Sequence, residues 1–519
     1  MSESELKPIW WLPTLGFFLF LAIEISMFAG QSQSDRMFED PGVGRHLRTA
    51  EFIIETGQIP KTDLLSFTHG GEPWFDFEWA FETTMGELYR VGGLALICAF
   101  CYAVFGATVM GIYRTLLQSG LSMAVVLLYT GMAFLTLRLH FAVRPVLFTY
   151  LFMALVVEVW YRQPKPRLRD WIFLPIVFVA WGNIHAGWLA ALVFLGGALV
   201  GRGLDRFMDE AEEPVPPILP WVGLTLVCGL ATLINPWGWP ENWQMVRMAT
   251  VYKSFAMWDE YLPPNFNTMT MSAITMLFLL GTISLARVLA RAPRWKLEMF
   301  VPFLFWLYEG LRAQRHVLIL MEVASVPVAR DLAALAMVQA PAFMRRWPPL
   351  LAEIREDILE RLRQFQVKQR LAGGDAILAL IAAVIIAFLF MRAPLGQHIT
   401  VGKGASPRLV AFLHEHPDRF HRPLTTTWNG GPLLWNARPD FRVAFDDRGD
   451  FFGDATVFKF VDMFYGTPGW KKTLAEGNYD SMILDPYVQL NQVIHFLPEW
   501  KEVYRDDHSV VYWKDSPAN

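Results

Sequence analysis

Charged residues are scarce in this chain of 519 residues, because only 18% are Asp, Glu, Lys or Arg whereas 54% are hydrophobic. This shortage excludes an ordinary soluble enzyme, and the charges that interrupt the apolar runs exclude a single membrane anchor. We therefore expect a polytopic α-helical membrane protein. The net charge of -4 gives no basis for nucleic-acid binding, since the Lys/Arg clusters fall in short loops where membrane topology accounts for them.

Cysteine is equally rare, and all three copies, Cys98, Cys101 and Cys228, lie inside apolar runs. Although Cys98 and Cys101 form a C-x-x-C motif, an apolar membrane helix is a poor place for redox chemistry or zinc binding, and we expect neither. The N-terminal MSESELK lacks the basic region and the cleavage site of a secretory signal. We therefore expect the first apolar segment, 9–30, to remain as a membrane span.

Apolar runs of membrane length recur along the chain and predict about eleven transmembrane helices. They lie at 9–30, 86–111, 121–138, 145–161, 171–184, 186–201, 218–235, 269–287, 298–312, 316–338 and 375–392. Basic loops alternate with acidic ones, so the positive-inside rule predicts a cytoplasmic N-terminus and an extracytoplasmic C-terminal region. Residues 348–371 have apolar positions at near-helical spacing among many charges, which predicts an amphipathic helix on the cytoplasmic surface.

The composition changes to that of a soluble domain after the last predicted span. A helical pattern at 407–416 precedes five β-like runs, with helical stretches between several of them. These runs are 423–427, 441–445, 481–484, 502–504 and 510–513. We therefore divide the chain into a transmembrane domain, 1–392, and a soluble α/β domain, 393–519.

The loop between the first two predicted spans, residues 31–82, holds ten acidic residues against four basic ones. In so apolar a chain, this concentration of acids predicts an active site close to the membrane surface. Apolar positions at helical spacing in 47–54 predict a short helix that ends near Gly57. We expect this helix to lie along the membrane interface with Arg45 and Arg48 towards water.

Residues 40–79, DPGVGRHLRTAEFIIETGQIPKTDLLSFTHGGEPWFDFEW, resemble the first periplasmic loop of a bacterial family of GT-C-like polytopic membrane glycosyltransferases. The matching features are an Asp-rich turn, a His-Leu helix, a G-x-I-P-x-x-D-x-x-S-F-T run, and the G-x-P-W and Glu-Trp motifs that follow. The family often has Trp-Trp before the His, where this chain has Gly44-Arg45. The C-terminal stretches WNGGPLLW and FRVAFDDRGDFF are also similar to the family.

The resemblance implies an inverting glycosyltransferase of the bacterial inner membrane, distantly similar to protein mannosyltransferases and oligosaccharyltransferases. It would use a polyprenyl-phosphate-linked sugar donor and an extracytoplasmic glycan, lipid or protein acceptor. In such enzymes an Asp just after the first span acts as a base or helps to hold a metal ion, and Asp40 has that position. Asp40 and Glu78 could together hold a divalent cation such as Mg²⁺ or Mn²⁺, but several GT-C enzymes act without one.

Each acidic candidate also has a structural interpretation. Asp40 precedes Pro41, and Asp followed by Pro is a good start for a helix. Glu78 could instead favour the dipole of the helix that follows it. Asp63, a candidate for substrate binding, could serve only a turn after Pro60.

Four further candidates, Arg144, His185, Arg315 and His316, fall at the outward ends of predicted spans, on the side of the acidic loop. Arginine suits a phosphate leaving group because its planar fork binds phosphate with two parallel hydrogen bonds. Membrane-interface snorkelling is the alternative, but the positive-inside rule disfavours arginine at outward ends. A lone His is more often structural, which leaves both interpretations open for His46 and His185.

The rival class is a non-catalytic membrane protein, either one that binds a lipid-linked glycan or a transporter or envelope-assembly subunit. A transporter would place charges near the middle of its spans and would show repeated halves. The acidic turn DDRGDFFGD does not have the spacing of an EF-hand, since Val457 stands where the closing Glu should be. A turn paired through Arg448 is the simpler interpretation.

Overall fold

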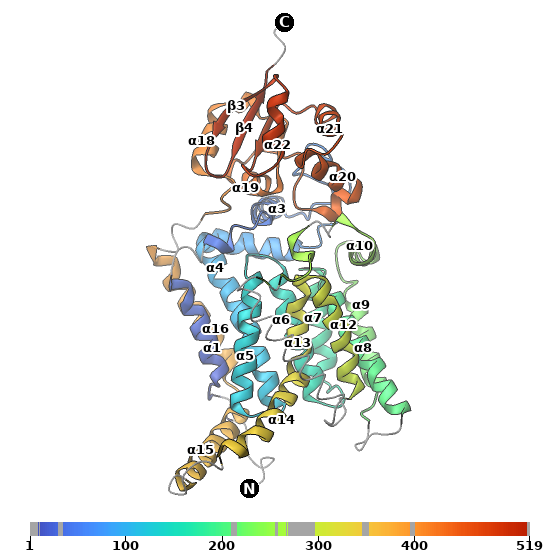
Figure 1. Ribbon diagram of the computed structural model, residues 1–519, viewed down its shortest axis with the longest axis vertical. Helices are drawn as coiled ribbons and strands as arrows, with labels where there is room; N and C mark the ends of the chain where they lie inside the picture. The colour runs from blue at the N-terminus through green and yellow to red at the C-terminus, as the bar shows by residue number, and fades with distance from the viewer. Residues whose placement is uncertain are drawn as a thin grey trace.

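The computed structural model describes residue 9 and residues 11–29, 35–208, 215–254, 258–265, 267, 296–344, 352–394 and 400–515. A long helical bundle carries a small α/β domain at one end (Figure 1). The expected helical class and the C-terminal sheet are therefore both present.

The bundle contains helices of very different length, each following an apolar run of the sequence. They are α1 (Leu15–Ser26), α4 (Trp79–Gln118), α5 (Met123–Leu137), α6 (Val146–Arg162), α7 (Asp170–Gly182), α8 (Trp188–Phe207), α9 (Leu219–Ala231), α12 (Leu297–Arg312), α13 (Val317–Val323), α14 (Ser325–Met344) and α16 (Asp375–Arg392). Every predicted span falls on these helices except 269–287, which lies outside the described residues. Within the described part of the chain, α4, α8 and α16 are long and apolar enough to cross a membrane, so the total of eleven remains a prediction.

The longest helix, α4, changes direction at Gly92 and Gly93. Both residues leave the helical conformation, and Gly93 has φ 61° and ψ -158°, a region that is essentially reserved for glycine. The part before the break leads away from the acidic loop, and the part after it belongs to the bundle (Figure 1).

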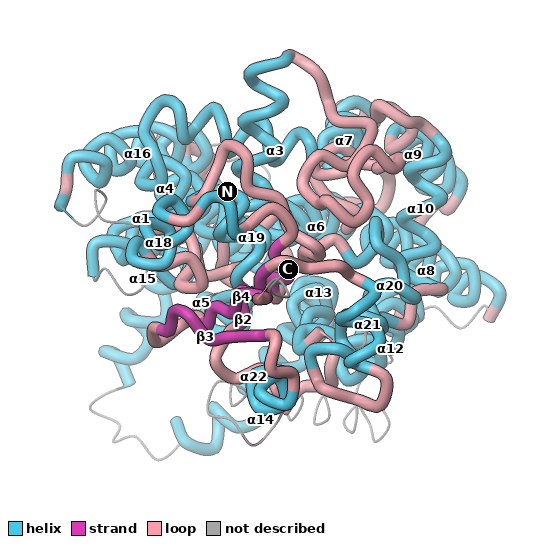
Figure 2. The backbone as a smooth tube through the Cα atoms, turned by 90° about the horizontal axis from the view of Figure 1, so that it is seen from above, coloured by secondary structure: helices cyan, strands magenta, loops and turns pink. Residues whose placement is uncertain are grey.

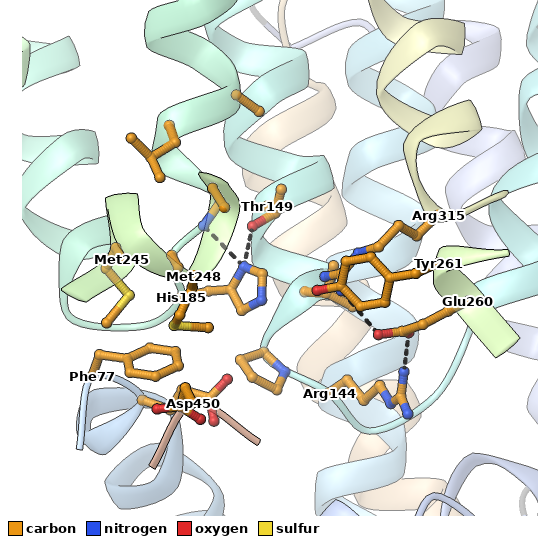
Figure 3. A pocket seen from close by; sticks show the side chains of 18 of the residues that line it. Phe77, Arg144, Thr149, His185, Met245, Met248, Glu260, Tyr261, Arg315 and Asp450 are labelled. Carbon is orange, nitrogen blue, oxygen red and sulfur yellow. Dashed lines mark hydrogen bonds and ion pairs between the residues drawn. The ribbon is translucent and has the colours of Figure 1, made fainter. Parts of the chain in front are cut away.

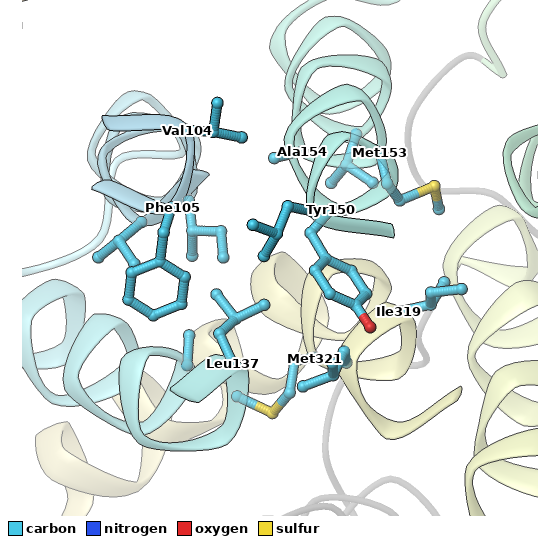
Figure 4. Close-up of a cluster of buried hydrophobic side chains, with 14 of the residues drawn as sticks. Val104, Phe105, Leu137, Tyr150, Met153, Ala154, Ile319 and Met321 are labelled. Carbon is cyan, nitrogen blue, oxygen red and sulfur yellow. The ribbon is translucent and has the colours of Figure 1, made fainter. Parts of the chain in front are cut away.

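Apolar side chains hold α4, α5, α6 and α13 together (Figure 4). Phe105, Leu137, Met153 and Met321 are all buried in this cluster. In a membrane, such packing stabilises through close van der Waals contact, since lipid tails are as apolar as the side chains themselves.

At the end of the bundle that carries the α/β domain, α3 (Gly42–Thr56) packs between α4 and α19 (Thr427–Asn436). A Cβ atom on Gly44 would lie 2.0 Å from the carbonyl oxygen of Gly431, so glycine allows the two helices to meet. The prediction that Arg45 faces water is wrong, because its side chain is buried among three carboxylates, two at the start of α4 and one in the α/β domain.

At the opposite end, α15 (Ala352–Leu371) is the helix predicted at 348–371, of which 348–351 lie outside the described residues. It is joined to the start of α1 by a hydrogen bond from the Ile9 N–H to the Leu371 carbonyl, 2.8 Å. Thr14 donates its backbone N–H to Asp375 Oδ1 at 2.7 Å. These bonds connect the two ends of the predicted transmembrane domain.

The α/β domain has a four-stranded sheet in the order β1-β2-β4-β3. Strand β1 (Pro423–Thr425) is parallel to β2 (Ser481–Leu484), and β4 (Val510–Lys514) runs antiparallel to β2 and to β3 (Trp500–Arg505). The helices of this domain are α18 (Pro407–Glu415), α19, α20 (Gly449–Phe464), α21 (Trp470–Glu476) and α22 (Leu490–Val493). Seen along the long axis, the strands lie over the helices, with α1 and α16 on one side and α8 and α9 on the other (Figure 2).

One predicted strand, 441–445, is wrong. Only Val443 makes a bridge, and its partner is Ser66 of the first loop and not a strand of the sheet. The reason is packing, since Val443 is buried with Leu65 of that loop and Leu434 of α19. This segment therefore fastens the first loop to the α/β domain.

Candidate active site

A cavity of about 840 Å³ lies where the bundle, the first loop and the α/β domain meet. Its lining includes seven of the eight residues predicted from the sequence: Asp40, His46, Glu78, Arg144, His185, Arg315 and His316. In Figure 3, Phe77 and Asp450 lie on one side, while Arg144, Glu260, Tyr261 and Arg315 lie on the other. The side with Arg144, Glu260, Tyr261 and Arg315 is called the basic side below, and the side with Phe77 and Asp450 is called the acidic side.

The basic side is centred on Glu260, which lies in the short helix η5 (Asp259–Tyr261). Arg144 donates to Glu260 Oε2 at 2.7 Å, and Arg315 donates to Glu260 Oε1 at 2.9 Å. Burial would raise the pKa of Glu260, but the two guanidinium groups outweigh it and bring the pKa to about 2. Glu260 is therefore ionised at neutral pH and joins the two arginines.

Both arginines are placed by breaks between helices. Arg144 precedes Pro145, the residue at which α6 begins, and Arg315 lies in η7 (Gln314–His316) between α12 and α13. The Arg315 guanidinium also lies 4.5 Å from the centre of the Tyr261 ring. Both side chains thus turn into the cavity, which is not the geometry of snorkelling to the interface.

The two carboxylate oxygens of Asp40 have different partners. Its Oδ1 accepts from the Gly42 N–H at 2.9 Å, at the start of α3, as a helix-initiating residue should. Its Oδ2 accepts from Arg144. One carboxylate oxygen therefore serves the fold, while the other faces the cavity.

Two of the cavity histidines, His140 and His185, are neutral at neutral pH. His185 Nδ1 accepts from the Gly187 N–H at 3.1 Å and lies 2.8 Å from Thr149 Oγ1. Burial, with help from Arg315, lowers the pKa of His185 to about 3. Burial likewise lowers the pKa of His140 to about 4. Both rings can exchange hydrogen bonds with a polar ligand without adding charge. The turn between α7 and α8 carries His185 into the cavity lining.

The acidic side surrounds Arg45. This arginine donates to Asp447 at 2.9 Å, to Glu82 at 3.1 Å and to Glu78 at 3.2 Å. Burial raises the pKa of Glu78 to about 8, partly opposed by Arg45 and reinforced by Asp450 and Asp447. Although Glu78 stands at the N-terminus of α4, its side chain makes no capping bond there, so it is turned towards the cluster and not used as a cap.

His46 and His316 each lie beside a carboxylate. His46 Nδ1 is 2.9 Å from Glu82 Oε1, and His316 Nδ1 is 3.0 Å from Glu309 Oε2. Burial and the neighbouring Arg45 hold the pKa of His46 well below its usual value.

The structure does not place Asp63 with the other candidates. Its carboxylate accepts from the backbone N–H groups of Leu65 and Ser66, both at 3.1 Å, as predicted for a turn. It also accepts from Arg448 at 2.7 Å, and Arg448 is bonded to Asp446 at 2.6 Å. Asp63 therefore connects the first loop to the turn of the α/β domain that was predicted to be paired through Arg448.

Comparison with solved structures then places the fold. No protein-family model matches the chain, and no curated protein sequence matches it. The apo oligosaccharyltransferase of Archaeoglobus fulgidus is similar, with a TM-score of 0.54 and 11% identity over 91% of this chain and 69% of that chain. The chain has a GT-C-like fold. The complex of that oligosaccharyltransferase, AglB, with an inhibitory peptide and a dolichol-phosphate gives a TM-score of 0.51, also at 11% identity over 91% and 69% of the two chains.

The GT-C-like resemblance stated from the sequence is thus confirmed for the fold. ArnT from Cupriavidus metallidurans bound to undecaprenyl phosphate is a further match, with 13% identity over 95% of this chain and 97% of that chain and a TM-score of 0.42. Identities this low concern the fold alone.

The residues of this cavity that sequence reasoning missed include Arg45, Glu260, Asp447 and Asp450. No motif marks Glu260, whose two partners are far away in the sequence. Asp447 and Asp450 lie in a turn that the spacing explained without reference to the first loop. The one available signal was Arg45, which stands where the related family often has tryptophan.

Proposed function

We propose that the chain is an inverting membrane glycosyltransferase that moves a sugar from a polyprenyl-phosphate-linked donor to an extracytoplasmic glycan, lipid or protein acceptor. The observation that carries this proposal is the convergence of Arg144 and Arg315 on one anion, Glu260, within the cavity. Two guanidinium forks that share a carboxylate have the geometry to share a phosphate. The likeness to an oligosaccharyltransferase supports the fold that such a reaction needs.

In the proposed complex, the donor phosphate takes the place of the Glu260 carboxylate between the two arginines. The apolar tail of the donor also has a route out of the cavity. Val193 of α8 and Phe305 of α12 line the cavity, yet they are 40% and 42% exposed on the surface of the bundle. The tail could therefore leave between these helices into the surrounding lipid.

In the proposed reaction, Asp40 Oδ2 takes the proton of an acceptor hydroxyl as its oxygen attacks the anomeric carbon. The bond from that carbon to the phosphate oxygen breaks, and the phosphate leaves with the electron pair. Arg144 and Arg315 stabilise its charge. When the phosphate binds Arg144, it competes with Asp40 for that guanidinium, so donor binding frees Asp40 to accept a proton.

The proposal places the protein in the bacterial inner membrane, with the cavity and the α/β domain on the extracytoplasmic side, where lipid-linked donors replace nucleotide sugars. Reporter fusions at about residue 60 and at the C-terminus test this placement. Cytoplasmic activity of either reporter would contradict it.

The direct test of the reaction is the Asp40→Asn variant. The amide can still accept from the Gly42 N–H, so the start of α3 is kept, but it cannot take a proton. We expect an unchanged melting temperature and a fall in glycan transfer by a factor of about 10²–10⁴ in membranes.

The matched control is Glu39→Gln, because Glu39 is the neighbouring acid, is bonded to Lys403 and does not line the cavity. It should transfer normally. Normal transfer by a folded Asp40→Asn variant would remove Asp40 from the mechanism.

A further inference from the structure

Three side chains on the acidic side are arranged as a divalent cation would require. One ligand atom each from His46, Glu78 and Glu82 lies within 4.8 Å of the others. Imidazole and carboxylate are common ligands of Mn²⁺ and related ions. Glu78 was also one of the two residues expected from the sequence to hold such a cation.

Arg45 already occupies one carboxylate oxygen of each glutamate. Its Nη1 donates to Glu82 Oε1 at 3.1 Å, and its Nη2 donates to Glu78 Oε2 at 3.2 Å. The Arg45 side chain is only 6% exposed, and a guanidinium group does not lose its proton in a protein. A divalent ion at these oxygens would therefore meet a fixed positive charge at contact distance.

The imidazole of His46 is also fully engaged. The Arg45 Nη2 lies 3.2 Å from His46 Nε2, and because guanidinium only donates, Nε2 must be the accepting nitrogen. Nδ1 then carries the proton and donates to Glu82 Oε1 at 2.9 Å. Neither nitrogen keeps a lone pair for a metal ion.

The same holds for the other expected cation ligand, since Asp40 is bonded to the guanidinium of Arg144. These residues therefore do not fit a divalent cation while their arginines are in place.

We infer that the guanidinium group of Arg45 takes the place of a divalent ion, since it supplies the positive charge that joins Glu78, Glu82 and Asp447. This arrangement connects α3, α4 and the α/β domain around one guanidinium group. The inference does not rest on the proposed function, because its test uses Mn²⁺ binding and no substrate.

The experiment titrates Mn²⁺ into the purified full-length chain in detergent and follows free Mn²⁺ by electron paramagnetic resonance. The parent chain should show no stoichiometric site. Arg45→Gln leaves three carboxylates without their cation and should gain one Mn²⁺ site, with binding about 10-fold tighter or more than in the parent. Adding Glu82→Gln to that variant should remove the site.

The matched control is Arg48→Gln, on the same helix, because Arg48 is partly exposed and is bonded to Glu51 outside the cluster. It should gain no Mn²⁺ site. If Arg45→Gln is unstable, its melting temperature is measured in EDTA and in Mn²⁺, so that stabilisation by the metal ion can still be detected.

An Arg45→Gln chain that is unstable in EDTA but recovers its melting temperature in Mn²⁺ supports the inference. A chain that stays unstable in both, or that folds without gaining Mn²⁺, overturns it. One Mn²⁺ bound by the parent and lost in Glu82→Gln would overturn it as well.

Discussion

Each side of the cavity is centred on a pair of arginines, but the two sides differ in their carboxylates. On the basic side, Arg144 and Arg315 are balanced by Asp40 and Glu260 alone. On the acidic side, Arg45 and Arg448 lie near a surplus of acids. Asp76, Glu78, Asp447 and Asp450 line the cavity, and Asp63, Glu82 and Asp446 lie behind the lining as partners of the two arginines. If the Glu260 carboxylate moves away from the two arginines, the basic side gains a net positive charge. On the acidic side, the removal of any one carboxylate leaves the acids in excess.

Exposure follows the same division. The side chains of Arg144 and Arg315 are 34% and 19% exposed, whereas those of Arg45 and Arg448 are 6% and 2% exposed. An exposed ion pair can exchange partners at little cost, while a buried one cannot. The basic side is therefore suited to binding an anion that comes and goes, and the acidic side to holding the α/β domain in place.

The largest effect should come from breaking the acidic side at Arg448. Arg448→Met leaves Asp63 and Asp446 buried without their cation, and we expect a loss of about 3–5 kcal/mol in the free energy of unfolding. The measurement is the melting temperature of the full chain in detergent. Arg505→Met is the control, since its bond to Glu502 is exposed and should contribute at most about 1 kcal/mol. Equal losses in the two variants would contradict the comparison.

A smaller effect should appear in the pH dependence of stability. Burial raises the pKa of Glu78 from 4.5 to about 8, so the folded chain holds a proton that the unfolded chain releases between these values. Stability should therefore fall as pH rises through this window, by at most about 1.4 kcal/mol per pH unit from this group.

Glu78→Gln should remove that part of the pH dependence, which melting temperatures from pH 5 to pH 9 will show. Glu87→Gln is the control, because Glu87 is exposed and bonded to Arg90. Parallel curves for the parent and Glu78→Gln would argue against a proton on Glu78.

On the basic side, Arg144→Lys and Arg315→Lys keep the charge but lose the planar fork. Each should weaken the binding of polyprenyl phosphate by about tenfold, or about 1.4 kcal/mol. Arg90→Lys, outside the cavity and exposed, should bind as the parent does. Unchanged affinity in both cavity variants would return these arginines to a purely structural role.

The smallest effect, and the only gain, is expected for Glu260→Gln. Removing the anion that competes for the two guanidinium groups should tighten the binding of polyprenyl phosphate about 3- to 10-fold. Isothermal titration with polyprenyl phosphate in detergent measures this change. Weaker binding would show that Glu260 positions the arginines instead of competing with the phosphate.

The sequence predicts the elements whose signal is local. Apolar runs mark the helices of the bundle and the short strand β2, and a run of β-branched and aromatic residues marks β4. Topology also brought Arg144, His185 and Arg315 to the same end of the bundle, because alternate loops face the same side of the membrane.

What escaped prediction depends on partners that are distant in the sequence. The helical pattern assigned Arg45 to the water-facing side of a helix, yet Arg45 is bonded to Asp447, which lies 402 residues further along the chain. Val443 was assigned to a strand, but it pairs with Ser66 of the first loop. Local periodicity cannot predict such contacts, because it describes one face of an element and not the surface that covers it.

The break at Gly92 and Gly93 divides α4 into two parts whose directions are independent, whereas a straight helix would fix one to the other. Unbroken, its 40 residues would extend about 60 Å, twice the hydrocarbon thickness of a bilayer, and would carry Glu78 far from the bundle. Because the chain turns at Gly93, the part beyond it can tilt to match a thicker or thinner membrane without moving the part before it. The part before it keeps Glu78 and Glu82 beside α3. The geometry of the cavity can therefore be kept in bilayers of different thickness.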